Sequence, residues 1–190
     1  MQTLGLSDST PRTESRWRAL FWPTIRSDVD LDYITRQGFW ICSTVAAVTL
    51  VVGAFTGSIV ENAFESLFFF LAGVGVRERS RVAAISAFAA YLLNALVMQR
   101  YGGSGFGVVR IIFLALLFAN IRGIWLSARW GDGSQIDITP IRLNATIADK
   151  LADQLPTFLW PKARFVFYVL AGLEIALLLF ALLGPRLDSL

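Results

Sequence analysis

The sequence predicts an all-helical integral membrane protein, a five-helix transmembrane bundle with amphipathic helices on its cytoplasmic side. Of its 190 residues, 55% are hydrophobic and only 16% are charged, whereas soluble domains average roughly 25% charged residues. The mean hydropathy is +0.59. A water-soluble fold of this size could not easily hide so much apolar surface, and the apolar residues are gathered into runs along the chain. We therefore expect hydrocarbon to surround most of the chain.

Four of the apolar runs are long enough to cross a bilayer. A hydrocarbon core about 30 Å thick takes roughly 20 helical residues to cross. The first run carries no charged residue at all. The predicted spans are residues 38–57, 82–99, 106–128 and 163–184.

A further run is shorter, and two interpretations of it remain open. Its clean apolar core covers only residues 66–76. Ser58 and Glu61 have the spacing of a capping box, in which the serine hydroxyl bonds the third amide and the glutamate reaches back. A helix over residues 59–76 is about 27 Å long, which is just enough to cross. The alternative is a re-entrant hairpin that enters and leaves on one side.

The lysines and arginines predict how the bundle is threaded. Cytoplasmic segments of membrane proteins carry an excess of both residue types. With a cytoplasmic N-terminus and five crossings, only Arg100, Arg110 and Arg186 of the seventeen fall on or near the other side. We therefore expect the C-terminal tail, residues 185–190, to lie outside, and the chain to reside in the inner membrane of a bacterium.

Two longer polar segments then lie in the cytoplasm. The start of residues 1–37 is expected to be disordered, and Ser27 is expected to cap a short helix later in this segment. Residues 129–162 form a linker that contains an amphipathic helix, 141–155, which Pro156 should end. Such a helix next to two spans is expected to lie in the headgroup plane. The predicted interfacial anchors are Trp125, Trp130, Trp160, Lys162 and Arg164.

Polar residues inside the predicted spans are costly and normally find partners within the bundle. Glu65 and Arg110 both descend from the outer face, which predicts an ion pair; the alternative is that Arg110 snorkels to the headgroups. Asn94 and Glu174 lie at similar depth, so we expect them to face one another. Their contact is interpreted as a hydrogen bond that links two helices, and the alternative is a proton or cation relay.

Two further polar residues lie near the end of the fourth span. Asn120 and Arg122 fall within its last two turns. Arg122 can reach the cytoplasmic headgroups or the carbonyls at the helix end. We interpret both as helix-end residues.

The sequence contains no recognisable catalytic, metal or cofactor site. Histidine, the commonest general base and metal ligand, is absent. A serine–lysine dyad would need Ser104 beside Lys150 or Lys162, and the topology puts them on opposite sides. Three aspartates at residues 28, 30 and 32 open like a calcium loop, but Tyr33 replaces the glycine that such a loop requires.

These features predict a non-catalytic membrane protein without a cofactor, an accessory or scaffolding subunit of a membrane complex. Its partners would be the bilayer and either a protein on the cytoplasmic side or further copies of itself. A nucleic-acid partner is not expected despite the net charge of +3, because the arginines form no single basic face. The alternative is a small oligomeric channel or transporter that uses Glu174 and Asn94.

Overall fold

The described part of the chain consists of helices joined by short turns. The computed structural model describes residues 21–22, 24–25, 28–103, 105–128 and 146–184. Five helices in it are long and apolar enough to cross a membrane, which confirms the predicted helical class. They are α2 (Asp28–Thr56), α3 (Ile59–Arg77), α4 (Arg81–Arg100), α5 (Val108–Ser127) and α6 (Ile147–Leu183).

Several predictions concern residues outside this described part. They are the segment up to residue 20, Ser27 as a cap, the loop residue Ser104, the anchor Trp130, the first residues (141–145) of the interfacial helix, and the tail 185–190.

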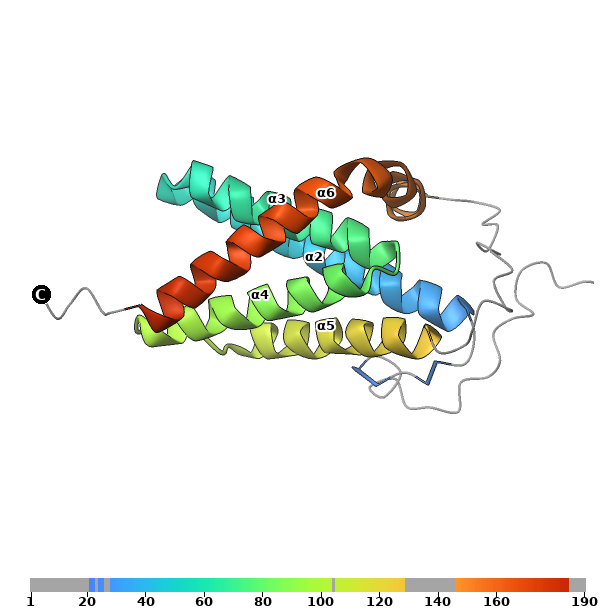
Figure 1. The fold of residues 1–190 in the computed structure, drawn as a ribbon, viewed down its shortest axis with the longest axis horizontal. Coiled ribbons are helices and arrows are strands. Elements are labelled where there is room, and N and C mark those ends of the chain that lie inside the picture. The colour runs from blue at the N-terminus through green and yellow to red at the C-terminus, as the bar shows by residue number, and fades with distance from the viewer. Residues whose placement is uncertain (1–20, 23, 26–27, 104, 129–145, 185–190) are drawn as a thin grey trace, which may run out of the picture.

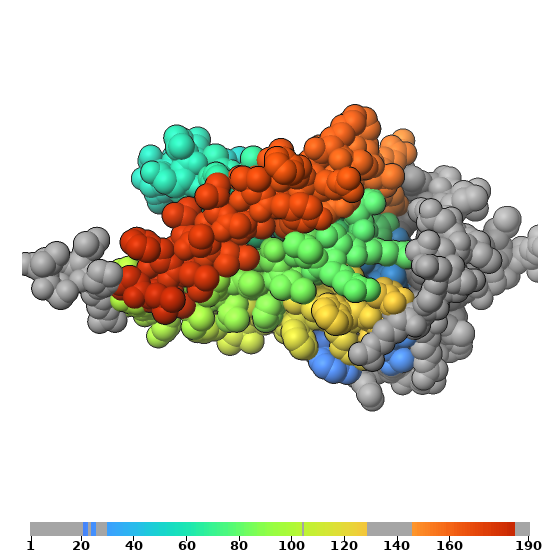
Figure 2. Space-filling view, in the orientation of Figure 1, coloured from blue at the N-terminus to red at the C-terminus, as the bar shows by residue number. Residues whose placement is uncertain are grey.

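Successive helices alternate in direction, so the bundle has two distinct ends (Figure 1). We call the end that holds Arg77 and the starts of α2 and α6 the clamp end. The opposite end, which holds Gly57 between α2 and α3 and residues 101–107 between α4 and α5, is the loop end. Towards the loop end the α2–α3 hairpin diverges from α4 and α5 (Figure 1). In the space-filling view α6 lies across the other helices on the visible face (Figure 2).

The α2–α3 hairpin packs closely because small residues meet along it. A Cβ atom on Gly53 would come within 2.4 Å of the Asn62 side chain, and one on Gly73 within 2.9 Å of Cys42. Between these contacts the Ser66 hydroxyl donates to the carbonyl of Ala46 at 2.8 Å. Small residues at such positions allow helix backbones to approach.

The middle of the bundle is filled by aromatic rings. Phe68, Phe69 and Phe167 are fully buried, and the rings of Phe68 and Phe167 stack with centroids 5.9 Å apart. The three rings belong to one apolar core cluster with an alanine face of α4. This face includes Ala83, Ala87 and Ala90, which are completely buried. This packing fills the region between the two ends with apolar side chains.

The second apolar run forms one unbroken helix, α3, of 19 residues. The hairpin alternative is therefore wrong. The capping box is wrong too: Ser58 is the N-cap but makes no side-chain cap bond. Instead the side-chain amide of Asn62 donates to the Ser58 carbonyl at 2.8 Å. A capping box does occur at the start of α6, between Thr146 and Asp149.

The end of α3 needs a left-handed residue, and Arg79 supplies it with φ 58°. The amide of Ser80 donates to the Gly75 carbonyl at 2.9 Å, and that of Arg79 to the Val76 carbonyl at 3.0 Å. These two bonds define a Schellman motif. The turn directs α4 back along α3.

Two predicted breaks are absent. Helix α2 begins at Asp28 and continues without interruption into the first span. Helix α6 runs for 37 residues through Pro156 and Pro161, so the prediction that Pro156 ends a separate helix is wrong. At 1.5 Å per residue α6 is about 55 Å long, nearly twice the hydrocarbon core of a bilayer. Its first turns therefore lie outside any part that crosses. Figure 1 shows them turned away from the direction of the rest of α6.

Replacing Gly75 by alanine should destabilise the bundle. A Cβ there would lie 2.5 Å from the Cβ of Ala83 and from the ring of Trp160, and overpacking of this kind costs about 1–3 kcal/mol. The measurement is unfolding by sodium dodecyl sulfate in mixed micelles. Gly172→Ala is the control, because a Cβ there meets nothing within 4 Å; it should stabilise α6 by about 0.5–1 kcal/mol. Equal effects of both changes would contradict the packing described.

Candidate functional site: a polar cluster and an arginine clamp

Four helices each contribute one residue to a polar cluster inside the bundle. Its members are Glu65 on α3, Asn94 on α4, Arg110 on α5 and Glu174 on α6. The Asn94 Nδ2 atom donates to Glu65 Oε1 at 3.1 Å. The Arg110 guanidinium donates to Asn94 Oδ1 at 3.3 Å. Asn94 thus bridges the carboxylate and the guanidinium, with its nitrogen on one and its oxygen on the other.

This bridge corrects the predicted Glu65–Arg110 ion pair. The ion pairs found among the described residues do not include a direct contact between these two side chains. A second guanidinium nitrogen of Arg110 lies 3.3 Å from the sulfur of Met98 on α4. Arg110 therefore turns toward α4, and the snorkelling alternative does not describe its contacts either.

Glu174 lies deeper in the same cluster and differs from the other members. It is 7% exposed, and no described residue gives it a hydrogen bond or an ion pair. It does lie within electrostatic reach of Glu65. The expected Asn94–Glu174 contact is not formed, because Glu65 and Arg110 occupy the amide of Asn94.

A second network, which we call the clamp, centres on Arg77 at the end of α3. The guanidinium contacts the carboxylates of Asp32 on α2 at 2.5 Å and of Asp153 on α6 at 2.8 Å. It also donates to the hydroxyl of Thr35 at 2.9 Å. The Arg77 side chain is only 10% exposed. One arginine therefore joins three helices.

The clamp also explains how α6 continues through Pro156. Proline lacks the N–H that would bond the carbonyl four residues earlier, which here belongs to Ala152. Arg77 Nε donates to that carbonyl at 3.0 Å. A side chain from α3 thus replaces the missing backbone donor, and this satisfies the buried acceptor.

A third ion pair secures the first turn of α6. Arg36 on α2 pairs with Asp149, which also closes the capping box with Thr146. Hydrogen bonds from the side chain and backbone of Thr146, and then from Arg36, lower the pKa of Asp149 from 3.8 to about 2. Asp149 therefore stays ionised at neutral pH and holds the start of α6 against α2.

Asn120 and Arg122 lie within the last eight residues of α5, and each also contacts another segment. Asn120 is fully buried; its amide donates to the Leu116 carbonyl at 2.9 Å, and a Cβ on Gly38 would lie 2.4 Å from its Oδ1. The guanidinium of Arg122 lies 4.4 Å from the ring centroid of Trp22. Both residues thus fix neighbouring segments on α5.

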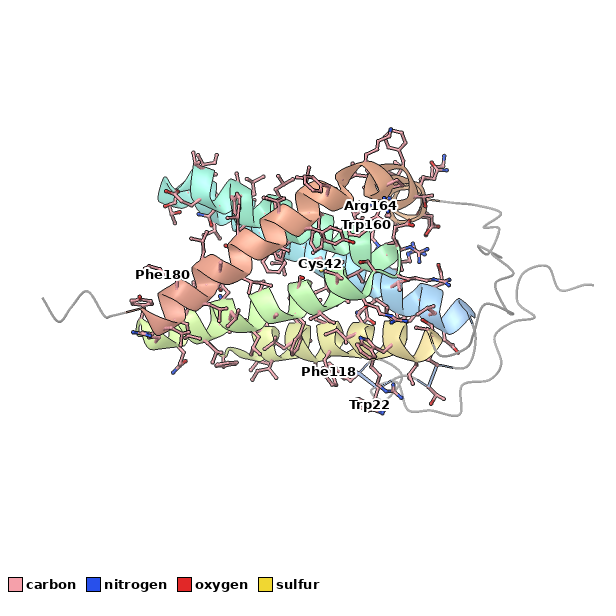
Figure 3. The ribbon with its side chains drawn as sticks, viewed as in Figure 1. Trp22, Cys42, Phe118, Trp160, Arg164 and Phe180 are labelled. Carbon is pink, nitrogen blue, oxygen red and sulfur yellow. The ribbon has the colours of Figure 1, made fainter. Side chains whose placement is uncertain are left out.

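The predicted anchors take different positions. Trp125 is exposed, and Arg81 lies over its ring at 5.7 Å. Lys162 and Arg164 are exposed, as expected of anchors. Trp160 instead packs inward against Gly75 and the ring of Phe167 at 5.5 Å. Figure 3 shows where Trp160 and Arg164 lie on α6. Trp160 is therefore a packing residue, because the missing Cβ of Gly75 leaves room for its ring.

Sequence reasoning missed the clamp. In the sequence, Arg77 served only as one of the basic residues that predict the topology. In the structure it contacts Asp32 and Asp153, which lie 45 and 76 positions away along the chain. No periodic pattern connects such positions. The one available signal was the proline in α6, which leaves a carbonyl in need of a donor.

No family model, curated protein or solved structure matches the chain. Among the described residues, no group of three or more histidine, cysteine, aspartate or glutamate side chains could hold a metal ion. The polar cluster can hold a proton or join four helices, and the clamp can position the start of α6.

We expect Arg77→Gln to release the first turns of α6. The change removes a guanidinium from two carboxylates and a donor from the Ala152 carbonyl, and breaking a buried pair costs about 3 kcal/mol at the lower end of the known range. Hydrogen exchange of residues 147–155 should rise in detergent micelles. Arg164→Gln, on an exposed arginine of the same helix, should leave that exchange unchanged. Unchanged protection in the Arg77 variant would contradict the clamp.

Asn94 should be energetically coupled to both of its neighbours. A double-mutant cycle with Asn94→Ala and Glu65→Gln, and a second with Arg110→Gln, should each give a coupling energy of about 0.6 kcal/mol, and at most about 1.7 kcal/mol. Unfolding in mixed micelles measures both. A cycle that pairs Asn94→Ala with Glu61→Gln, on an exposed residue at the start of α3, should give none. Additivity in all three cycles would disprove the bridge.

Proposed function

We propose that this chain is a non-catalytic multi-pass membrane protein that serves as an accessory or scaffolding subunit, with its clamp end in the cytoplasm. Cytoplasmic ends of membrane proteins are rich in lysine and arginine. The clamp end carries Arg77, Arg79, Arg81, Lys150, Lys162 and Arg164, whereas the helix ends at the loop end carry Arg100 and Arg110. This asymmetry supports a cytoplasmic N-terminus and an external C-terminus in a cell membrane.

The observation that carries the proposal is the way the first part of α6 is held. One of its faces packs on the bundle through Ala152, Leu155 and Leu159. The other face leaves Ile147, Leu151 and Phe158 exposed, with 80%, 43% and 68% of their surfaces accessible. Exposed apolar side chains on a helix fixed in place are typical of surfaces that receive another protein or a membrane.

Rigid fixation favours a protein partner over lipid alone. A surface that is already ordered loses little conformational entropy when it binds. The clamp and the Arg36–Asp149 pair hold this segment at both its first turn and its proline. A segment that only rested on headgroups would not require ion pairs from two other helices to hold it.

Transport is the second candidate, and the polar cluster is the observation that favours it. Charged groups from several helices at membrane depth commonly mark ion or proton pathways. Here the cluster lies toward the loop end, and the stacked rings of Phe68 and Phe167 fill the core beyond it. A continuous path to the clamp end is not supported by this packing.

Phe158→Ala should weaken a complex that the wild-type chain forms. The truncation removes an exposed ring from the proposed docking face, and a central aromatic contact is worth about 1–2 kcal/mol or more, which is at least about a fivefold change in affinity. Native mass spectrometry after purification in mild detergent measures the fraction of chain in a stoichiometric complex. Phe180→Ala is the matched control, because Phe180 is 75% exposed but lies near the loop end (Figure 3).

Two results would count against the accessory role. One is a chain that stays alone in mild detergent; the other is equal complex formation by both variants. Reconstituted vesicles test transport directly: proton or cation flux that disappears in Glu174→Gln would favour the second candidate.

A further inference from the structure

The polar cluster forms a graded series from the loop end toward the middle of the bundle. Positions along each helix follow from the residue count at 1.5 Å per residue. Arg110 lies about 3 Å from the start of α5, and Asn94 about 9 Å from the end of α4. Glu65 lies about 9 Å from the start of α3, and Glu174 about 14 Å from the end of α6. The side chains therefore descend from Arg110, through Asn94 and Glu65 at equal depth, to Glu174.

The charges in this series do not balance without a further positive charge. Two carboxylates and one guanidinium leave one negative charge when all three are ionised. Helices α2, α3 and α4 pack against α6, and they add Cys42 and Tyr91, and at the loop end of α4 also Arg100 and Tyr101, which bond the carbonyls of Gly184 and Ala181. The thiol and the two phenols are neutral at neutral pH, and the carbonyl that Arg100 binds lies about 15 Å along α6 from Glu174, counted at 1.5 Å per residue. An unbalanced charge at this depth costs several kcal/mol, so one proton or one small cation must complete the cluster.

The hydrogen bonds indicate which carboxylate takes the added charge. Glu65 accepts a hydrogen bond from Asn94, whose oxygen accepts one from Arg110, so Glu65 has the kind of polar partner that favours an ionised carboxylate. Glu174 is more than nine-tenths buried, and no described residue gives it a bond. Its closest charge is Glu65, of the same sign. The uncompensated carboxylate is therefore that of Glu174.

A proton fits this position better than a metal cation. A cation needs several oxygen ligands, but the oxygen of Asn94 already accepts a bond from Arg110. No group of three acidic or sulfur ligands occurs among the described residues. A proton needs only one carboxylate oxygen and forms one O–H bond there.

The core closes the site on its inner side. One turn and two turns from Glu174 toward the clamp end, Ala171 and Phe167 are buried in the main core. Phe167 stacks on Phe68, which lies one turn from Glu65 in the same direction. These rings offer no polar group to carry a proton onward.

We propose that Glu174 holds an exchangeable proton that arrives from the loop end past Arg110, Asn94 and Glu65 and goes no further. Loading forms an O–H bond on the Glu174 carboxylate, and unloading breaks it and returns the proton to the loop end. The site is thus a one-sided proton-binding site rather than a channel. It does not depend on the accessory role proposed above.

Labelling with dicyclohexylcarbodiimide, which reacts with protonated carboxyl groups in apolar surroundings, tests the proton directly. Mass spectrometry of the protein in micelles should find the adduct at Glu174 near neutral pH, with a yield that falls about tenfold per pH unit above its midpoint. Glu174→Gln should abolish the adduct, and the exposed control Glu61→Gln should leave it unchanged. No adduct at any pH at which the bundle stays folded, or a yield independent of pH, would overturn the proposal.

The neighbouring charges provide a second test that burial alone would not pass. Glu65→Gln removes the like charge, so the midpoint for labelling Glu174 should move to lower pH by about one unit or more. Arg110→Gln removes the balancing charge, so the midpoint should move up by a similar amount. Midpoints that do not move in either variant would show that the cluster does not act as one charge-balanced unit.

Cysteine accessibility tests the direction of entry. Leu178→Cys and Ala171→Cys place thiols one turn on either side of Glu174, and native Cys42 is buried. A membrane-impermeant methanethiosulfonate is added to each side of vesicles of known orientation. The Leu178→Cys variant should react from the loop-end side, and the Ala171→Cys variant from neither. Failure at the first position, or reaction at the second from the clamp-end side, would refute one-sided access.

Discussion

The position of α6 depends on one arginine that performs two tasks. Pro156 removes a backbone donor, and the guanidinium of Arg77 supplies another to the Ala152 carbonyl. The same group forms ion pairs with Asp32 and Asp153. A buried acceptor without a donor costs free energy comparable to a lost hydrogen bond, so the two requirements reinforce one another. Because Arg77 ends α3 and Asp32 lies in α2, the hairpin that forms the core also directs the first turns of α6.

The two polar networks differ in how fully their members are partnered. In the clamp, each carboxylate faces a guanidinium, and the network joins three helices at one end of the bundle. In the cluster, Asn94 is engaged by both of its neighbours, whereas Glu174 has only the like charge of Glu65 nearby. A network in which each carboxylate has a partner specifies a structure, while a buried carboxylate without a partner requires something further. The aromatic core separates the two, so each can act without the other.

Much of the fold could be predicted because the apolar runs have helical length. The structure places helix ends close to the predicted ones for α3, α4 and α5. One error falls where a distant residue replaces a local rule, and another where a residue one turn away does so. Proline should end a helix, yet α6 continues because Arg77 compensates for it. Ser58 and Glu61 should form a capping box, but the side chain of Asn62 binds the Ser58 carbonyl instead.

The residues of the polar cluster were recognisable from the sequence, because an ionisable side chain in an apolar run is conspicuous. Their pairing was not, since helical depth leaves the direction of each side chain around its helix undetermined. By itself the sequence determined the helical class, the five apolar helices and which polar residues lie within them, all of which follow from composition and local period. Only the tertiary structure decided that Asn94 bridges Glu65 and Arg110, that Trp160 packs inward on Gly75, and that Arg77 holds α6. Contacts between residues dozens of positions apart depend on how helices rotate and tilt against one another, and no local pattern encodes that.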